Sequence, residues 1–110
     1  FSFCCVAPAI IKNKKNLELR FFENIGSDIG LLFQISDDFI DHKGNSKIAG
    51  KKTGKDQKKG KATLISLLGY NNAFKYCNNL IININKKLQK YGSNSKKIIQ
   101  TLEHILIRDR

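Results

Sequence analysis

The chain has 110 residues, a hydrophobic share of 41% and a formal net charge of +11. The hydrophobic share excludes an intrinsically disordered chain, and the length allows one small domain or a piece of a larger one. No run of about 18 apolar residues occurs, which excludes a helix that spans a bilayer. The charge indicates an anionic partner, for which nucleic acid, a membrane surface and a phosphorylated small molecule are candidates.

The sequence of residues 1–11 predicts that they form the end of a buried helix. They are mostly apolar and no basic segment precedes them, so they do not have the pattern of a signal peptide. The chain lacks an initiating methionine and begins inside a hydrophobic pattern, from which we expect a severed amino terminus. Cys4, Cys5 and Cys77 fit no C-x-x-C pattern. We expect all three to be reduced core residues of an intracellular, cytoplasmic protein.

After a polar connector at residues 12–16, a long helix is predicted from residue 17 to about residue 41 or 42. Asn16 can cap it, and apolar residues recur along it at spacings of three and four. Gly26 and Gly30 each cost up to about 1 kcal/mol relative to alanine, and they indicate either a kink or a close approach by another group. The predicted apolar positions are Leu17, Phe21, Ile25, Ile29, Leu32, Ile35 and Phe39, with Phe33 also assigned to the core.

The apolar pattern stops over residues 43–61, where four of the eight glycines lie among eight lysines. We predict a basic loop here, with a helical turn that starts near Asp56. A helix resumes over residues 62–68 and stops around Gly69. The next helix, capped by Asn71 or Asn72, ends at Gly92. Its predicted buried face holds Phe74, Cys77, Leu80, Ile81, Ile84 and Leu88.

A last helix is predicted to follow its cap at Ser95. Five apolar residues are expected to face inward from it, namely Ile98, Ile99, Leu102, Ile105 and Leu106. No strand pattern occurs in the sequence, so the predicted fold class is all-α.

Three aspartates, Asp37, Asp38 and Asp41, lie close together in this otherwise basic chain. Spacings of three and four residues place them on one helix face, together with Gln34. Carboxylates at one-turn spacing suit a hard cation such as Mg²⁺, which proteins usually hold by one or two carboxylates, waters and substrate phosphates. The alternative is a solvated acidic helix end that forms plain salt bridges with the lysine-rich loop.

The loop sequence GKKTGKDQKKGKAT, residues 50–63, places lysines beside glycines that let the backbone approach a ligand. It is not a P-loop, because G-x-x-x-x-G-K-[ST] is not satisfied. Its lysines can simply neutralise the aspartates, or the two sets can grip a polyanion between ammonium groups and a metal ion, as phosphate chemistry requires. Asp56 can join the metal's outer shell or cap a helix.

Residues 30–69, GLLFQISDDFIDHKGNSKIAGKKTGKDQKKGKATLISLLG, resemble the second aspartate-rich region of the trans-isoprenyl diphosphate synthases, the polyprenyl synthetase family. The family pattern reads G-x-x-F-Q-x-x-D-D-x-x-D, a short loop, G-K-x-x-G-x-D and then G-K-x-T. The tail HILIRDR is also similar to the family's carboxyl terminus. The resemblance therefore identifies residues 1–110 as the C-terminal fragment of a single all-helical prenyl synthase domain, with the N-terminal part and its first aspartate-rich motif absent.

This resemblance is closest to bacterial-type farnesyl diphosphate synthases, partly through Asp56 and Gln57. It implies the isoprenoid synthase fold, Mg²⁺ and a homodimer. The implied reaction condenses isopentenyl diphosphate with an allylic diphosphate, dimethylallyl or geranyl, to make farnesyl diphosphate. Neither a nucleic acid partner nor a transmembrane segment is expected. Arg108 and Arg110 can fold over the active site or fray, as termini often do.

The resemblance assigns roles residue by residue. Asp37 matches the metal-binding aspartate, Asp38 and Asp41 complete its motif, and Asp56 matches an acid near the metal, in its outer shell. Gln34, Lys51 and Lys61 match the residues that contact the substrate and its diphosphate, and they are the expected catalytic residues. A departing diphosphate gains negative charge in the transition state, so fixed cations aimed at it accelerate ionisation.

Other functions stay open at this point. A geranylgeranyl or longer-chain synthase and a non-catalytic synthase-like subunit both keep the fold. A basic nucleic-acid-binding module is a third alternative, but no aromatic residue lies within residues 43–61 to stack on bases, and the aspartates would repel a phosphate backbone. Because one aspartate-rich motif cannot close a trinuclear Mg²⁺ cluster, we expect these residues alone to turn over no substrate.

Overall fold

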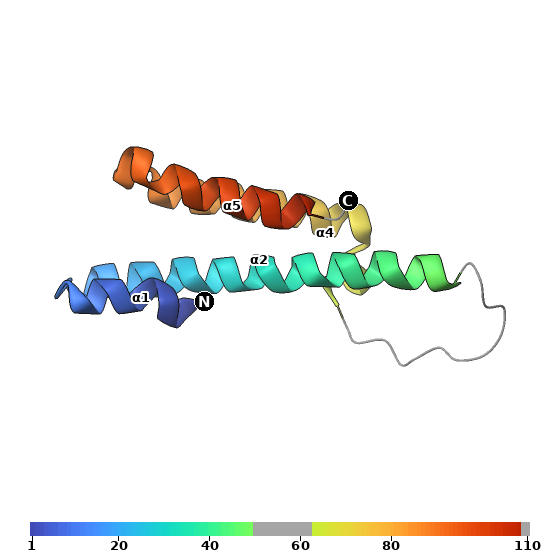
Figure 1. Ribbon diagram of the computed structural model, residues 1–110, viewed down its shortest axis with the longest axis horizontal. Helices are drawn as coiled ribbons and strands as arrows, with labels where there is room; N and C mark the ends of the chain where they lie inside the picture. The colour runs from blue at the N-terminus through green and yellow to red at the C-terminus, as the bar shows by residue number, and fades with distance from the viewer. Residues whose placement is uncertain (50–62, 109–110) are drawn as a thin grey trace.

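The computed structural model describes residues 1–49 and 63–108, with side chains described for 1–43 and 63–108 (Figure 1). Its helices are α1 (Ser2–Ile11), α2 (Asn16–Ala49), α3 (Leu64–Leu68), α4 (Tyr70–Leu88) and α5 (Lys96–Ile107), and a 3₁₀ segment, η1 (Gln89–Ser95), joins α4 to α5. No strand occurs within these two ranges, so the predicted all-α class is confirmed.

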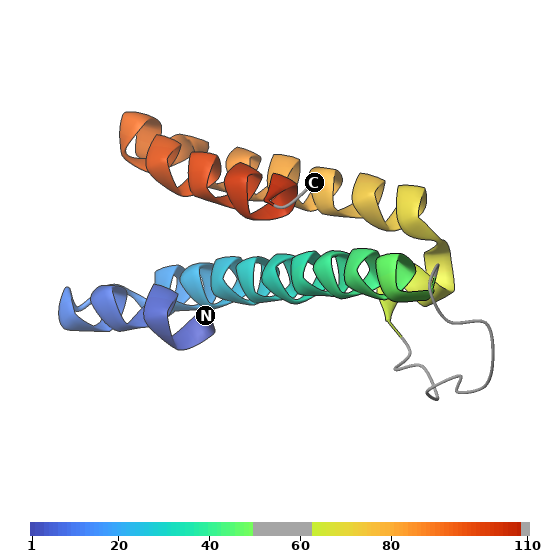
Figure 2. The ribbon, with the colours of Figure 1, turned by 45° about the vertical axis from the view of Figure 1, so that its right-hand side comes forward.

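The 34-residue helix α2 is the centre of the arrangement. α1 packs along one side of its first half, and α4 and α5 lie together on the opposite side (Figures 1 and 2). Helix α3 sits beside both α2 and α4 and leads directly into α4. Because every other helix contacts α2, this helix fixes the relative positions of all the others.

The predicted carboxyl end of α2 was wrong. The helix continues to Ala49, into the segment that sequence analysis assigned to a loop from residue 43. A helix that is already nucleated gains one hydrogen bond for each residue added, and residues 43–49 contain no proline and one glycine to oppose that gain. At its other end α2 begins at Asn16, one residue early, because the carbonyl of Lys15 already accepts from the amides of Glu18 and Leu19, at 2.8 and 3.1 Å.

Gly26 marks a close approach of α1, one of the two predicted alternatives. A Cβ atom at this position would lie 2.5 Å from the Cα atom of Ser2, a contact that a folded chain does not tolerate. At Gly30 an added Cβ would lie 3.5 Å from the Phe1 side chain, which is ordinary van der Waals contact. The Oγ atoms of Ser2 and Ser27 are 2.9 Å apart across the same junction. α1 therefore runs antiparallel to α2, with its amino end against the middle of the longer helix.

Two local features determine the turn between α3 and α4. Thr63 caps α3, since its Oγ1 accepts from the amide of Ser66 at 3.2 Å and its own amide donates to the Ser66 hydroxyl at 2.9 Å. Gly69 then takes φ = 78°, a conformation that glycine adopts at no steric cost. Because this turn starts α4 at once, the predicted cap at Asn71 or Asn72 is wrong, and Asn72 instead donates to the Leu68 carbonyl at 3.0 Å.

The junction before α5 follows the prediction more closely. Gly92, which was predicted to end the helix, lies beyond the end of α4 with φ = 58°, a non-helical conformation. Ser95 occupies the position before α5, but its hydroxyl donates to the Gly92 carbonyl at 2.8 Å and does not cap the helix.

The core lies where α2, α3, α4 and α5 meet. Leu17 and Ile98 are not core residues as predicted, since Leu17 is 81% exposed and Ile98 is 44% exposed. The buried cluster consists of Ile25, Leu32, Ile35, Phe39, Ile65, Ala73, Cys77, Ile81, Ile84, Leu88, Ile99, Leu102 and Leu106.

The cysteines are all thiols, as predicted, but only Cys77 is a buried core residue. Cys4 is exposed on α1 and Cys5 is half-buried, so the prediction of three core cysteines was wrong. Burial, followed by the neighbouring Cys4, raises the pKa of the Cys5 thiol, which therefore stays protonated at neutral pH. Among the described helices, none combines the length and the apolar character that crossing a bilayer requires.

Candidate functional site

We call the side of α2 that carries Gln34, Asp37, Asp38 and Asp41 the acidic face. α2 is continuous through these residues, so their spacing of three and four brings the side chains to one side of the helix. Gln34 and Asp41 are exposed, whereas Asp37 and Asp38 are half-buried. The opposite side of the same turns packs on α4 and α5. The carboxylates therefore project from a helix whose position the core fixes.

The acidic face begins where the cover by α1 stops. Gly26 and Gly30 precede it at helical spacing on the same side of α2, and both lie under the first residues of α1. The ring of Phe1 lies 5.2 Å from that of Phe33, between centroids. Phe33 is consequently half-buried at this edge, and its assignment to the core was wrong.

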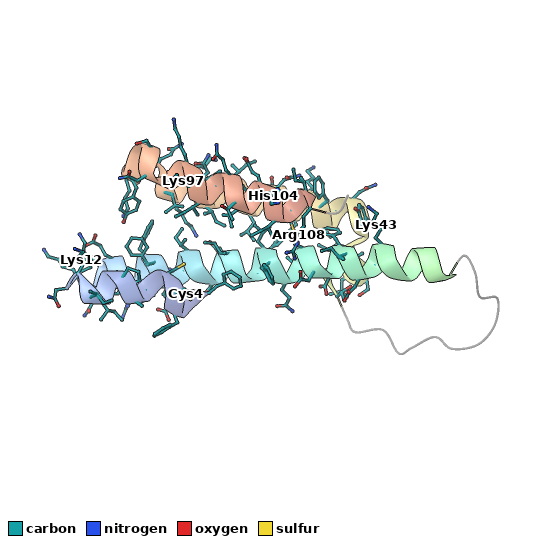
Figure 3. All side chains as sticks on the ribbon, in the orientation of Figure 1. Cys4, Lys12, Lys43, Lys97, His104 and Arg108 are labelled. Atoms are coloured by element: carbon teal, nitrogen blue, oxygen red, sulfur yellow. The ribbon has the colours of Figure 1, made fainter. Side chains whose placement is uncertain are left out.

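Arg108, the first residue after α5, reaches the acidic face. Its Nη2 donates to Oδ1 of Asp37, and its guanidinium carbon lies 5.0 Å from the centroid of the Phe33 ring. Figure 3 shows Arg108 between the end of α5 and the middle of α2. Of the two alternatives for this residue, the structure supports the one in which it folds over the candidate site. Arg110 lies outside the described residues.

A buried serine holds the end of α5 in this place. Ser36, which is 2% exposed, donates from its hydroxyl to the carbonyl of Ile105 at 2.6 Å. This carbonyl belongs to the last turn of α5, where carbonyls lack an intrahelical partner. Ser36 and Asp37 are neighbours on α2, so two consecutive residues bond to the carboxyl end of one helix. No motif in the sequence marks Ser36, so this contact was not predicted.

Comparison with known proteins adds the decisive observation. A family model described as polyprenyl synthetase matches residues 1–102. The chain belongs to the polyprenyl synthetase family. Its helices are accordingly part of the all-α isoprenoid synthase fold.

Several curated relatives of this polyprenyl synthetase chain are similar over most of its length. It is 33% identical over 97 residues to a farnesyl diphosphate synthase of Micrococcus luteus, covering 86% of this chain and 33% of the relative. It is 31% identical over 105 residues to a dimethylallyltranstransferase of Fischerella ambigua, covering 96% of this chain and 30% of the relative. It is 35% identical over 107 residues to a chloroplastic geranylgeranyl pyrophosphate synthase of Capsicum annuum, covering 94% of this chain and 28% of the relative. The chain spans about a third of the length of these relatives, and no solved structure matches it.

The donor chemistry of the acidic face fits the Mg²⁺ that the polyprenyl synthetase family implies. Within residues 1–49 and 63–108, no group of three or more His, Cys, Asp or Glu side chains is arranged to hold a metal ion. Side chains one turn apart on a helix start about 5–6 Å apart at their Cβ atoms, which limits how many can reach one ion. Mg²⁺ needs only one or two carboxylates, because waters and substrate phosphates complete its octahedron. Asp37, Asp38 and Asp41 can supply that share.

The other expected site residues of this polyprenyl synthetase chain cannot be placed against the acidic face. Lys51, Asp56 and Lys61 fall within residues 50–62, outside the described part of the chain. Their assigned contacts with diphosphate and metal stay predictions. The cation that does lie beside Asp37 in the described part is Arg108, which sequence analysis left between two alternatives.

Proposed function

We propose that this chain is the C-terminal part of a Mg²⁺-dependent prenyltransferase that joins isopentenyl diphosphate to an allylic diphosphate. Dimethylallyl and geranyl diphosphate are the proposed allylic substrates, and farnesyl diphosphate is the proposed product. The observation that supports this best is the family match over residues 1–102 combined with a partly exposed acidic face on a core-anchored helix. Relatives named as geranylgeranyl synthases are as similar as those named as farnesyl synthases, so geranylgeranyl diphosphate is the second candidate product.

Each proposed residue has a chemical task. Asp37, Asp38 and Asp41 would hold the metal, which when bound supplies positive charge for the diphosphate. Gln34 lies one turn before Asp37 and Asp38, where its exposed amide can donate to the substrate. Lys51 and Lys61 would place fixed positive charge at the leaving group, where negative charge grows in the transition state. No side chain has to act as a general base to start such an ionisation.

The activity requires more than this chain supplies. We propose that residues 1–110 alone bind a diphosphate but transfer no prenyl group, since a second set of metal-binding carboxylates is needed. The homodimer and the cytoplasmic location that the resemblance implies are part of the same proposal. A steady-state prenyl transfer assay on the 110-residue chain would contradict it by yielding product.

A calorimetric titration with geranyl diphosphate tests the binding step. We expect binding to require Mg²⁺ and to be lost in Asp37→Asn, because a neutral amide is a poor ligand for a hard cation. Asp28→Asn is the matched control: it removes one negative charge from the same helix, at a residue paired with Lys87 at 2.7 Å and outside the acidic face. Binding without Mg²⁺, or equal loss in both variants, would argue against the proposal. Mg²⁺-independent binding of duplex DNA would favour the nucleic-acid module instead.

A further inference from the structure

We propose that Arg108 competes with the metal ion for Asp37, so that cation binding at the acidic face and release of the Arg108 side chain are linked. The inference rests on the proposed function, because it takes the acidic face as the metal site. It adds an internal competitor whose affinity for Asp37 sets how readily a metal ion binds.

The two cations compete for the same carboxylate of Asp37. The guanidinium of Arg108 occupies Oδ1 of Asp37 through its Nη2. A hard divalent ion takes its ligand oxygen through a lone pair and at short range. The fixed positive charge of the guanidinium also repels a second cation that approaches the same carboxylate. A metal ion that binds Oδ1 therefore meets both an oxygen already used by Arg108 and the repulsion of its charge, and both favour release of the guanidinium.

The Arg108–Asp37 pair has the features of a contact that can exchange. The Asp37 side chain is 50% exposed and that of Arg108 is 28% exposed, so water can replace either partner. The Nε atom of Arg108 is buried and finds no hydrogen-bond partner among the described residues, so the guanidinium is not locked by a full set of bonds. Partly exposed ion pairs of this kind contribute little to stability and are screened by salt.

Arg108 nevertheless remains close to Asp37 when the ion pair opens. The Ser36 hydroxyl bonds to Ile105, three residues earlier, and Leu106 is buried in the core. Neither contact depends on the carboxylate. The competition is therefore intramolecular, with a high effective concentration of guanidinium at every metal concentration.

A titration of the 110-residue chain with Mn²⁺ alone, followed by the loss of the free-ion electron paramagnetic resonance signal, tests the competition. Arg108→Gln is expected to bind Mn²⁺ about twofold to fivefold more tightly, the range that an exposed ion pair can contribute. Arg108→Lys, which keeps the charge, is expected to stay nearer the parent chain.

Lys87→Gln is the matched control. It removes one positive charge from the other described ion pair that links two distant helices, Lys87 with Asp28. Asp28 lies nine residues before Asp37, or about 13 Å along a helix, which exceeds the Debye length of about 8 Å at physiological ionic strength. We expect Lys87→Gln to leave Mn²⁺ affinity unchanged, and an equal gain in both glutamine variants would overturn the local competition.

A second readout follows the side chain itself. In the parent chain, Mg²⁺ is expected to shift the ¹⁵N resonance of the Arg108 Nε–H group, whereas in Asp37→Asn this resonance should not respond to Mg²⁺. If Mn²⁺ binding depends on Asp37, but Arg108→Gln leaves the affinity unchanged and Mg²⁺ does not shift the Arg108 resonance of the parent chain, the inference fails while the proposed metal site stands. If no variant binds Mn²⁺ at Asp37, both fail.

Discussion

The two sides of α2 between residues 32 and 41 differ in almost every physical respect. On one side, Leu32 is 0% exposed and packs with Ile35 and Phe39 against α4 and α5. On the other side, the Asp37 side chain is half exposed. The buried side determines where the helix lies, and the acidic side determines what it can bind. Substitutions on the two sides should therefore separate stability from ligand binding, and those on the buried side should lower the free energy of unfolding most.

Leu32→Ala should have the largest effect. Removing a fully buried leucine leaves a cavity and is expected to lower the free energy of unfolding by about 2–5 kcal/mol. Urea denaturation followed by circular dichroism measures this. Leu31→Ala, at the adjacent 39% exposed leucine, is the control and should cost much less. Equal losses in the two variants would show that the buried side does not position α2.

Gly26→Ala should come next, because the new Cβ would lie 2.5 Å from the Ser2 backbone. We expect a loss of about 1–3 kcal/mol, as for other overpacked contacts, together with faster amide hydrogen exchange in α1. Gly30→Ala meets only the Phe1 side chain at 3.5 Å. It should be neutral or stabilising by up to about 1 kcal/mol, since alanine is the better helix former. The opposite order would mean that α1 does not pack on Gly26.

Ser36→Ala should lower the free energy of unfolding by about 1 kcal/mol, the net contribution of a typical hydrogen bond. The loss should be larger if the Ile105 carbonyl is left buried without a partner. The same denaturation assay measures it. Thr101→Ala removes an exposed hydroxyl that bonds within α5 to the Lys97 carbonyl at 2.8 Å, and it should be close to neutral. A neutral Ser36→Ala would indicate that the core alone holds the end of α5.

Asp37→Asn should have the smallest effect on stability, within about 0.5 kcal/mol, because it removes one partly exposed ion pair. The salt dependence of the unfolding free energy should also become slightly weaker. A loss above about 2 kcal/mol would assign Asp37 a mainly structural role and would break the contrast between the two sides of α2.

The sequence pattern predicted the helices well where periodic burial governs them. Cys77, Ile81, Ile84 and Leu88 all lie in the core as predicted, because a long amphipathic stripe has one favourable way to bury itself. The carboxyl end of α2 and the start of α4 were misplaced. Those boundaries depend on propagation of a helix already formed and on the φ of Gly69, neither of which leaves a strong local signal.

The candidate site was only partly predictable for a different reason. The grouping of Asp37, Asp38 and Asp41 on one face follows from their spacing. The bonds from Ser36 to Ile105 and from Arg108 to Asp37 join residues 69 and 71 positions apart, so they arise from the packing of α5 on α2. No local pattern encodes a pairing of this kind.

The direction of α1 has a further consequence. Phe1, the residue before α1, rests on Gly30 and Phe33, and the amino end of α1 points along α2 toward the aspartates. A polypeptide that continued this helix upstream of Phe1 would advance about 1.5 Å per residue, so about one to three additional turns would extend along α2 past Asp37 and Asp41. In any chain with helical residues before Phe1, the fit of Ser2 against Gly26 would fix the register in which those residues meet the acidic face.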